Sequence, residues 1–177
     1  GSGSQSSEDR GGGIGQGGPS GGGSATGGGN TGNPDGGTSP TTATVALVTK
    51  LGKPARVLIG LGSTSIDQMK SQGIHPDIVE QYLVGVGPGS WPTWNNPDGA
   101  YLTFTAQAIQ AYGAIPMFTL YQMTANGEGN LSGISDATFM NKYWAEVRLM
   151  YQRTADLGTS VLVNLEQDFW GFVASQA

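Results

Sequence analysis

The sequence contains no cysteine, and His75 is its only histidine. The lack of cysteine excludes disulfides, thiolate metal ligands and cysteine nucleophiles. One histidine without cysteine is too few ligands for an ordinary zinc or other transition-metal site. We therefore expect no metal centre.

The chain also has none of the common nucleotide or nucleophile signatures where they would have to lie. Neither GxGxxG nor GxxxxGK[ST] follows any apolar run that could be a strand. These glycine-rich turns have to connect a strand to a helix before they can bind phosphates. No GxSxG follows such a run either, which argues against an α/β-hydrolase serine. We expect no cofactor.

Charged residues are few, and acidic residues exceed basic ones. The chain has 8 Lys and Arg against 13 Asp and Glu, a net charge of −5. No basic patch is present, so we expect no nucleic-acid partner. No apolar run approaches the roughly 20 residues of a membrane-spanning helix.

The N-terminal quarter of the chain has almost no aliphatic or aromatic residues. Residues 1–44 are mainly Gly, Ser, Thr, Asn, Asp and Pro, and Ile14 is the only large aliphatic residue among them. Such a segment cannot bury enough apolar surface to offset its ordering entropy, so we expect 1–44 to be a disordered linker. Tethers of this composition often precede the domains of secreted proteins and bacterial lipoproteins. This predicts a secreted or cell-surface location, with a lipid-anchored tether as one form of it.

Residues 45–177 have the composition of a folded domain, and their apolar pattern alternates between two periods. Short apolar runs predict strands at 56–62, 82–87, 114–123 and 160–168. Helical spacing and capping residues predict helices at 66–72, 100–112 and 137–156, and His75-Pro76-Asp77 predicts a further short helical turn. This order indicates an α/β fold of parallel βα units. Two architectures remain open, a doubly wound sheet and part of a (β/α)8 barrel.

The fourth predicted strand carries the clearest candidate site. Its alternation places Leu162, Asn164, Glu166 and Asp168 on one face, with the carboxylates about 7 Å apart in an extended strand. In both architectures the carboxyl ends of the strands form the site. We expect Glu166 to be a general acid/base, with a pKa raised by neighbouring aromatic rings, and Asp168 to be a second catalytic candidate.

Aromatic and amide side chains follow the other predicted strands. Sugar rings stack on flat side chains while amides and carboxylates bond their hydroxyls, so this combination predicts a saccharide site. The candidate substrate-binding residues are Trp91, Trp94, Asn95, Tyr121, Gln122, Asn164 and Trp170.

The segment VLVNLEQDFWGF at 161–172 resembles the fourth strand of glycoside-hydrolase-like (β/α)8 barrels, in which an acid/base glutamate ends that strand. The resemblance implies the N-terminal half of such a barrel, a carbohydrate-active hydrolase, and a polysaccharide or oligosaccharide as partner. It also implies a nucleophile on a later strand. The alternatives are a non-catalytic module that binds carbohydrate or peptide, and a structural surface domain without a site.

Overall fold

The computed structural model describes residues 42–62 and 65–176. Most of the linker predicted at 1–44 lies outside these residues. Helix α1 (Thr42–Lys50) includes the last three residues of the predicted linker. Within the described ranges, no helix combines the length and the apolar character required to cross a membrane.

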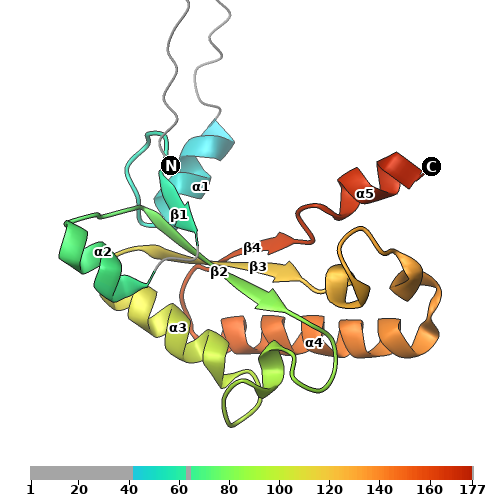
Figure 1. The fold of residues 1–177 in the computed structure, drawn as a ribbon. Coiled ribbons are helices and arrows are strands. Elements are labelled where there is room, and N and C mark those ends of the chain that lie inside the picture. The colour runs from blue at the N-terminus through green and yellow to red at the C-terminus, as the bar shows by residue number, and fades with distance from the viewer. Residues whose placement is uncertain (1–41, 63–64, 177) are drawn as a thin grey trace, which may run out of the picture. The chain divides into compact units, whose positions relative to one another are not determined.

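The described residues form a four-stranded parallel sheet, which confirms the predicted α/β fold of parallel βα units (Figure 1). The strands are β1 (Gly60–Gly62), β2 (Ile78–Val84), β3 (Ile115–Tyr121) and β4 (Leu162–Leu165). Their order in the sheet is β1-β2-β3-β4, the order of the chain. A doubly wound sheet reverses its strand order at a switch point, and these four strands contain no such reversal.

The three helices between the strands were predicted to within one residue, because local signals define their ends. They are α2 (Ile66–Gln72), α3 (Ala100–Ala111) and α4 (Ala137–Asp156). Ser65 forms a capping box with Gln68, and Gly73 takes the left-handed conformation that ends α2. At α4 the Asp136 carboxylate accepts hydrogen bonds from the amides of Thr138 and Phe139.

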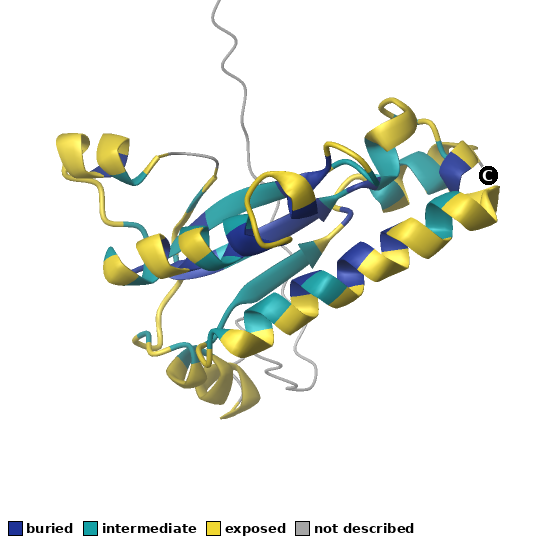
Figure 2. Ribbon diagram, turned by 90° about the horizontal axis from the view of Figure 1, so that it is seen from below, coloured by how far each residue is buried: buried dark blue, intermediate teal, exposed yellow. Residues whose placement is uncertain are grey.

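All three helices pack on one face of the sheet. Leu83, Phe118 and Leu120 form the main core with residues of α3 and α4, and Met69 of α2 packs against Val79 and Ile109 in a smaller one. Figure 2 shows buried residues on the strands and on the helix sides turned toward them, whereas the outer sides of the helices are exposed. On α4, Met150 is fully buried in the main core, whereas the neighbouring Tyr151 is 49% exposed.

Two strand predictions were displaced. The strand predicted at 56–62 is reduced to β1 at Gly60–Gly62, and the strand predicted at 82–87 is β2 at Ile78–Val84. The helical turn predicted at His75–Asp77 is absent, since the chain enters β2 directly after Asp77. Gly85 and Gly87 have φ of 83° and 81°, a left-handed conformation that ends the strand.

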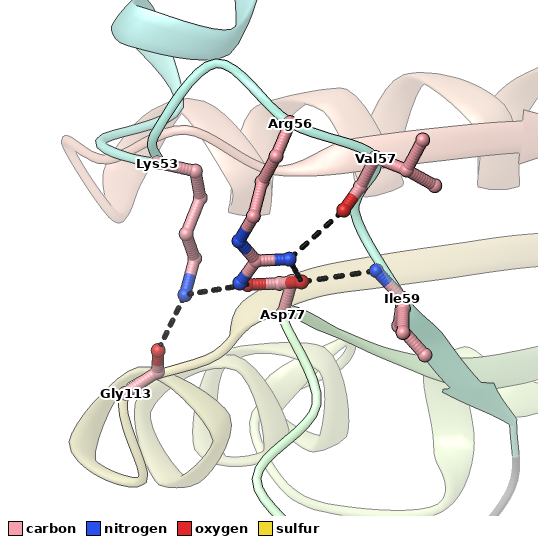
Figure 3. A network of polar contacts seen from close by, with 6 residues as sticks. All are labelled: Lys53, Arg56, Val57, Ile59, Asp77 and Gly113. Atoms are coloured by element: carbon pink, nitrogen blue, oxygen red, sulfur yellow. Dashed lines mark hydrogen bonds and ion pairs between the residues drawn. The ribbon is translucent and has the colours of Figure 1, made fainter.

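Asp77 explains why residues 53–59 do not extend β1 (Figure 3). Its carboxylate accepts two hydrogen bonds of 2.7 Å from the Arg56 guanidinium and one of 3.0 Å from the Ile59 amide. Lys53 lies 3.9 Å from the same carboxylate and donates to the Gly113 carbonyl. The Arg56 hydrogen bond, followed by that of Ile59, lowers the pKa of Asp77. These side-chain contacts hold the segment beside the start of β2, together with hydrogen bonds from the Asp77 and Ile78 amides to the Ile59 carbonyl.

The remaining elements lie in the connections and after β4. Three short 3₁₀ helices occur in the loops, η1 (Trp91–Thr93), η2 (Met123–Asn126) and η3 (Ser132–Ser135). The strand predicted at 160–168 stops at Leu165, and an unpredicted helix, α5 (Phe169–Gln176), follows it. Figure 1 shows α5 beyond the carboxyl end of β4.

Candidate functional site

The sheet face opposite α2, α3 and α4 carries a row of polar and aromatic side chains. Tyr82, Thr119 and Asn164 are register partners on β2, β3 and β4, so their side chains lie on the same face. Strand alternation adds Glu80 and Tyr121 to this face. We call these five residues, Glu80, Tyr82, Thr119, Tyr121 and Asn164, the polar face.

Hydrogen bonds and ring contacts join the members of the polar face. The buried Thr119 hydroxyl donates to the Glu80 carboxylate and accepts a hydrogen bond of 3.4 Å from the Asn164 amide. The rings of Tyr82 and Tyr121 meet edge to face, with centroids 6.1 Å apart. The arrangement places one carboxylate, one amide and two tyrosines on adjacent strands.

Glu80 has room on this face because Gly62 stands beside it on β1. A Cβ atom at Gly62 would lie 3.0 Å from Oε2 of Glu80. Any larger residue at position 62 would therefore crowd the carboxylate. Glu80 thus reaches across the sheet from Gly62 on one side to Thr119 on the other.

Gln167 and Asp168 extend the polar face past the end of β4. The Gln167 amide donates a 2.8 Å hydrogen bond to the Tyr82 hydroxyl. Burial, followed by the hydrogen bond and the charge of Asp168, raises the pKa of Tyr121. Asp168 is exposed, so it can accept hydrogen bonds from a ligand as well as from Tyr121.

Glu166 lies elsewhere, between the sheet and α4. It is 4% exposed, and its φ of 51° turns the chain out of the strand. Its carboxylate accepts hydrogen bonds of 3.0 and 3.1 Å from the amides of Gln122 and Met123, and one from the Tyr143 hydroxyl. Burial raises the pKa of Glu166, and these hydrogen bonds offset part of that rise.

The prediction that Asn164, Glu166 and Asp168 share one strand face is therefore wrong. β4 ends at Leu165, and the left-handed conformation of Glu166 interrupts the alternation. Asn164 bonds Thr119 on the polar face, whereas Glu166 bonds Tyr143 in the core beneath the sheet. Glu166 also lines a cavity of about 10 Å³ between the end of β3 and α5. That volume holds about one water molecule and no sugar ring.

Gln122 is fully buried in a second polar network on the helix side. Its side-chain amide donates to the Gly85 carbonyl at 2.7 Å and to the Glu146 carboxylate of α4. Glu146 in turn accepts from the Gly87 amide at 2.7 Å and from the Ser90 hydroxyl at 3.0 Å. This network fixes the loop after β2 to α4 and leaves Gln122 away from the polar face.

The predicted tryptophan platform is divided among three places. Trp91 is fully buried in the main core. Trp94 is 40% exposed and packs edge to face on Tyr101 of α3, and Asn95 is exposed beside it. Trp170 is 71% exposed on α5, where its ring contacts Phe169.

Of the predicted site residues, the structure brings Tyr121, Asn164 and Asp168 together at the polar face. Glu166 shares a small cavity with Tyr121 but bonds the core, and Gln122, Trp91, Trp94 and Asn95 lie away from the polar face. Four residues at the polar face were not predicted as site residues: Glu80, Tyr82, Thr119 and Gln167. The alternation of Glu80 and Tyr82 was visible in IVEQYLV, and a strand assigned from Ile78 would have identified both.

In the described part of the chain, no three His, Asp or Glu side chains are grouped closely enough to hold a metal ion. Comparisons with protein-family models, curated proteins and solved structures find no match for this chain. The proposals below therefore depend on the geometry of the polar face.

Proposed function

We propose that this domain is carbohydrate-active and that a saccharide binds on the polar face. The observation that carries the proposal is the grouping of Tyr82 and Tyr121 with Glu80 and Asn164 on one sheet face. A tyrosine ring offers an apolar surface for the CH groups of a sugar and a hydroxyl for its polar edge. Carboxylate and amide oxygens accept hydrogen bonds from sugar hydroxyls.

The fold proposal that accompanies this function is a partial (β/α)8 barrel. Two observations support it: the strand order follows the chain, and all three intervening helices pack on one face. In a barrel the opposite face is the interior, and its residues near the carboxyl ends of the strands form the site. Tyr121 and Asp168 lie at those ends, as such a site requires.

Polar residues on this face are difficult to explain by packing alone. A parallel strand buried on both faces is normally apolar throughout. Here Glu80, Tyr82 and Asn164 are half-buried and Thr119 is fully buried beneath the same surface. A ligand that forms hydrogen bonds with Glu80 and Asn164 would explain why polar side chains occupy these strand positions.

Calorimetric titration of the whole chain with neutral hexasaccharides tests the proposal. The panel would contain β-1,4-glucan, β-1,3-glucan, α-1,4-glucan, mannan and xylan hexamers. We expect at least one to bind, and Tyr121→Ala to weaken it by about tenfold, the loss of one stacked ring at about 1–1.5 kcal/mol. Trp144→Ala is the matched aromatic control, because Trp144 is 51% exposed on α4. No binding by this panel, or by hexasaccharides of either charge, would refute the proposed function.

Hydrolysis is a second candidate function, and it requires that Glu166, which is buried and bonded by Gln122, Met123 and Tyr143, become accessible to a saccharide at the end of β4. A general acid must carry a proton near neutral pH, and burial acts in that direction. The test is release of reducing ends from the same glycans, as polysaccharides, by the wild-type chain and by Glu166→Gln. Equal rates for the two proteins, each shown to be folded by circular dichroism, would rule out Glu166 as the acid.

A further inference from the structure

The groups that carry charge near the polar face are all acidic. Glu80 lies on the face itself, and Asp168 bonds Tyr121 at its edge. The charges of Asp168, Glu128 and Glu166 all act on the Tyr121 hydroxyl and contribute to raising its pKa. A ligand near Tyr121 would therefore experience a negative potential.

The basic residues in the described part of the chain lie on other elements. They are Lys50 on α1, Lys53 and Arg56 before β1, Lys70 on α2, and Lys142, Arg148 and Arg153 on α4. Lys142 is close to Gly87 at the loop after β2, and Arg153 bonds the Asp98 carbonyl on the helix side. None of the seven lies on a strand.

The acidic groups at the polar face are also not neutralised by ion pairs. Both ion pairs formed between described residues involve Asp77, before the start of β2. Glu80 receives a neutral hydroxyl donor from Thr119, which leaves its formal charge uncompensated. An uncompensated carboxylate that is half-buried interacts with a nearby charge more strongly than one in bulk water.

From this charge distribution we propose that the polar face selects saccharides by charge, taking amino sugars with a free ammonium group and rejecting uronic acid and sulfated sugars. The inference rests on the proposed saccharide site and names its substrate class. An ammonium group near Glu80 gains an ion pair, whereas a sugar carboxylate meets like charge. Discrimination against the wrong ligand thus comes from repulsion as well as from attraction.

The size of the effect follows from one pair of charges near a protein surface. Such a pair changes affinity by about fivefold in either direction, so the amino and acidic ligands should differ by at least about tenfold. Because the contact is partly exposed, the difference should shrink when salt rises from about 0.05 to about 0.5 M.

The test compares three β-1,4-linked hexasaccharides with the same glucose backbone: a neutral glucan, a glucosamine oligomer with an ammonium group at C2, and a glucuronan with a carboxylate at C6. We expect the glucosamine oligomer to bind most tightly, the neutral glucan less tightly and the glucuronan most weakly. Glu80→Gln keeps an oxygen that can accept from Thr119 and removes the charge, so the ratio of glucosamine to glucuronan affinity should drop by about tenfold. Asp168→Asn should lower it by less, because Asp168 is exposed. Asp156→Asn, which removes an equal charge from the end of α4, should leave the ratio unchanged.

The outcomes separate the two proposals. If no neutral or charged saccharide binds, the proposed function fails and the charge selection fails with it. If a neutral hexasaccharide binds but the glucosamine oligomer binds no more tightly than the glucuronan, the saccharide site stands and the charge selection is overturned. A ratio that persists in folded Glu80→Gln and Asp168→Asn would also overturn it, by showing that other groups set the preference.

Discussion

Replacing Glu166 with alanine should destabilise the domain, because this carboxylate joins three parts of the fold. It accepts hydrogen bonds from the amides of Gln122 and Met123, after β3, and from the Tyr143 hydroxyl of α4. Alanine leaves these donors without their acceptor in a site that is 4% exposed in the wild type.

The expected loss is about 2 kcal/mol of unfolding free energy. Each buried donor left without a partner costs at least about 1 kcal/mol. Part of this is recovered, because alanine removes a carboxylate whose raised pKa shows that burial disfavours its charged form. A small residue also lets a water molecule enter the neighbouring cavity of about 10 Å³.

Urea unfolding at neutral pH, followed by tryptophan fluorescence, measures this loss. Glu128→Ala is the matched control, since Glu128 is exposed, and it should change the unfolding free energy by less than about 0.5 kcal/mol. If Glu166→Ala matched that control, the carboxylate would not join these elements. Glu166 would then be free for a role at a ligand site, contrary to the geometry described above.

Three further predictions concern pH and packing. The pKa of Asp77 is lowered, so its contribution to stability is present above its unfolded pKa and is lost as pH falls through the folded pKa. Asp77→Asn should therefore lower the melting temperature at neutral pH and have little effect in strong acid. An equal change of melting temperature at both pH values would contradict this. The pKa of Glu166 is raised, so its contribution to stability is present at low pH and is lost as pH rises through the folded pKa. Glu166→Gln should therefore flatten that part of the plot of unfolding free energy against pH. An unchanged plot would argue against the raised pKa. Gly133→Ala should lower the unfolding free energy by about 1–3 kcal/mol in urea, because the added Cβ would lie 2.8 Å from the Phe139 ring. In the control Gly171→Ala, in α5, the added Cβ meets no atom within 4 Å and should not destabilise the domain. Equal losses in the two variants would contradict this packing.

Helices α2 and α4 were predictable because their capping signals are local. Ser65 and Gln68 lie within one turn of α2, and the Asp136 cap is adjacent to α4. The start of β2 was not predictable in this way. Pro76-Asp77 has the form of a helix start, but Arg56, 21 residues earlier, binds Asp77 in the folded chain. That long-range contact overrides the local preference.

The candidate site was predicted only in part for a related reason. Alternation along 160–168 assumes that the strand continues, and a left-handed conformation at a glutamate cannot be read from the residue type. Tyr121 and Asn164 were found because their strands were placed nearly correctly. Glu80 and Tyr82 were missed because β2 begins at Ile78, earlier than predicted.

The central claim is that saccharide binds on the polar face. Amide chemical-shift mapping tests it most directly, using the hexasaccharide that binds most tightly in the titrations. A saccharide bound there should cause the largest shifts at Glu80, Tyr82, Thr119, Tyr121 and Asn164, and small shifts along the outer sides of α3 and α4. Shifts concentrated on those helices, or no shifts at saturating saccharide, would contradict it.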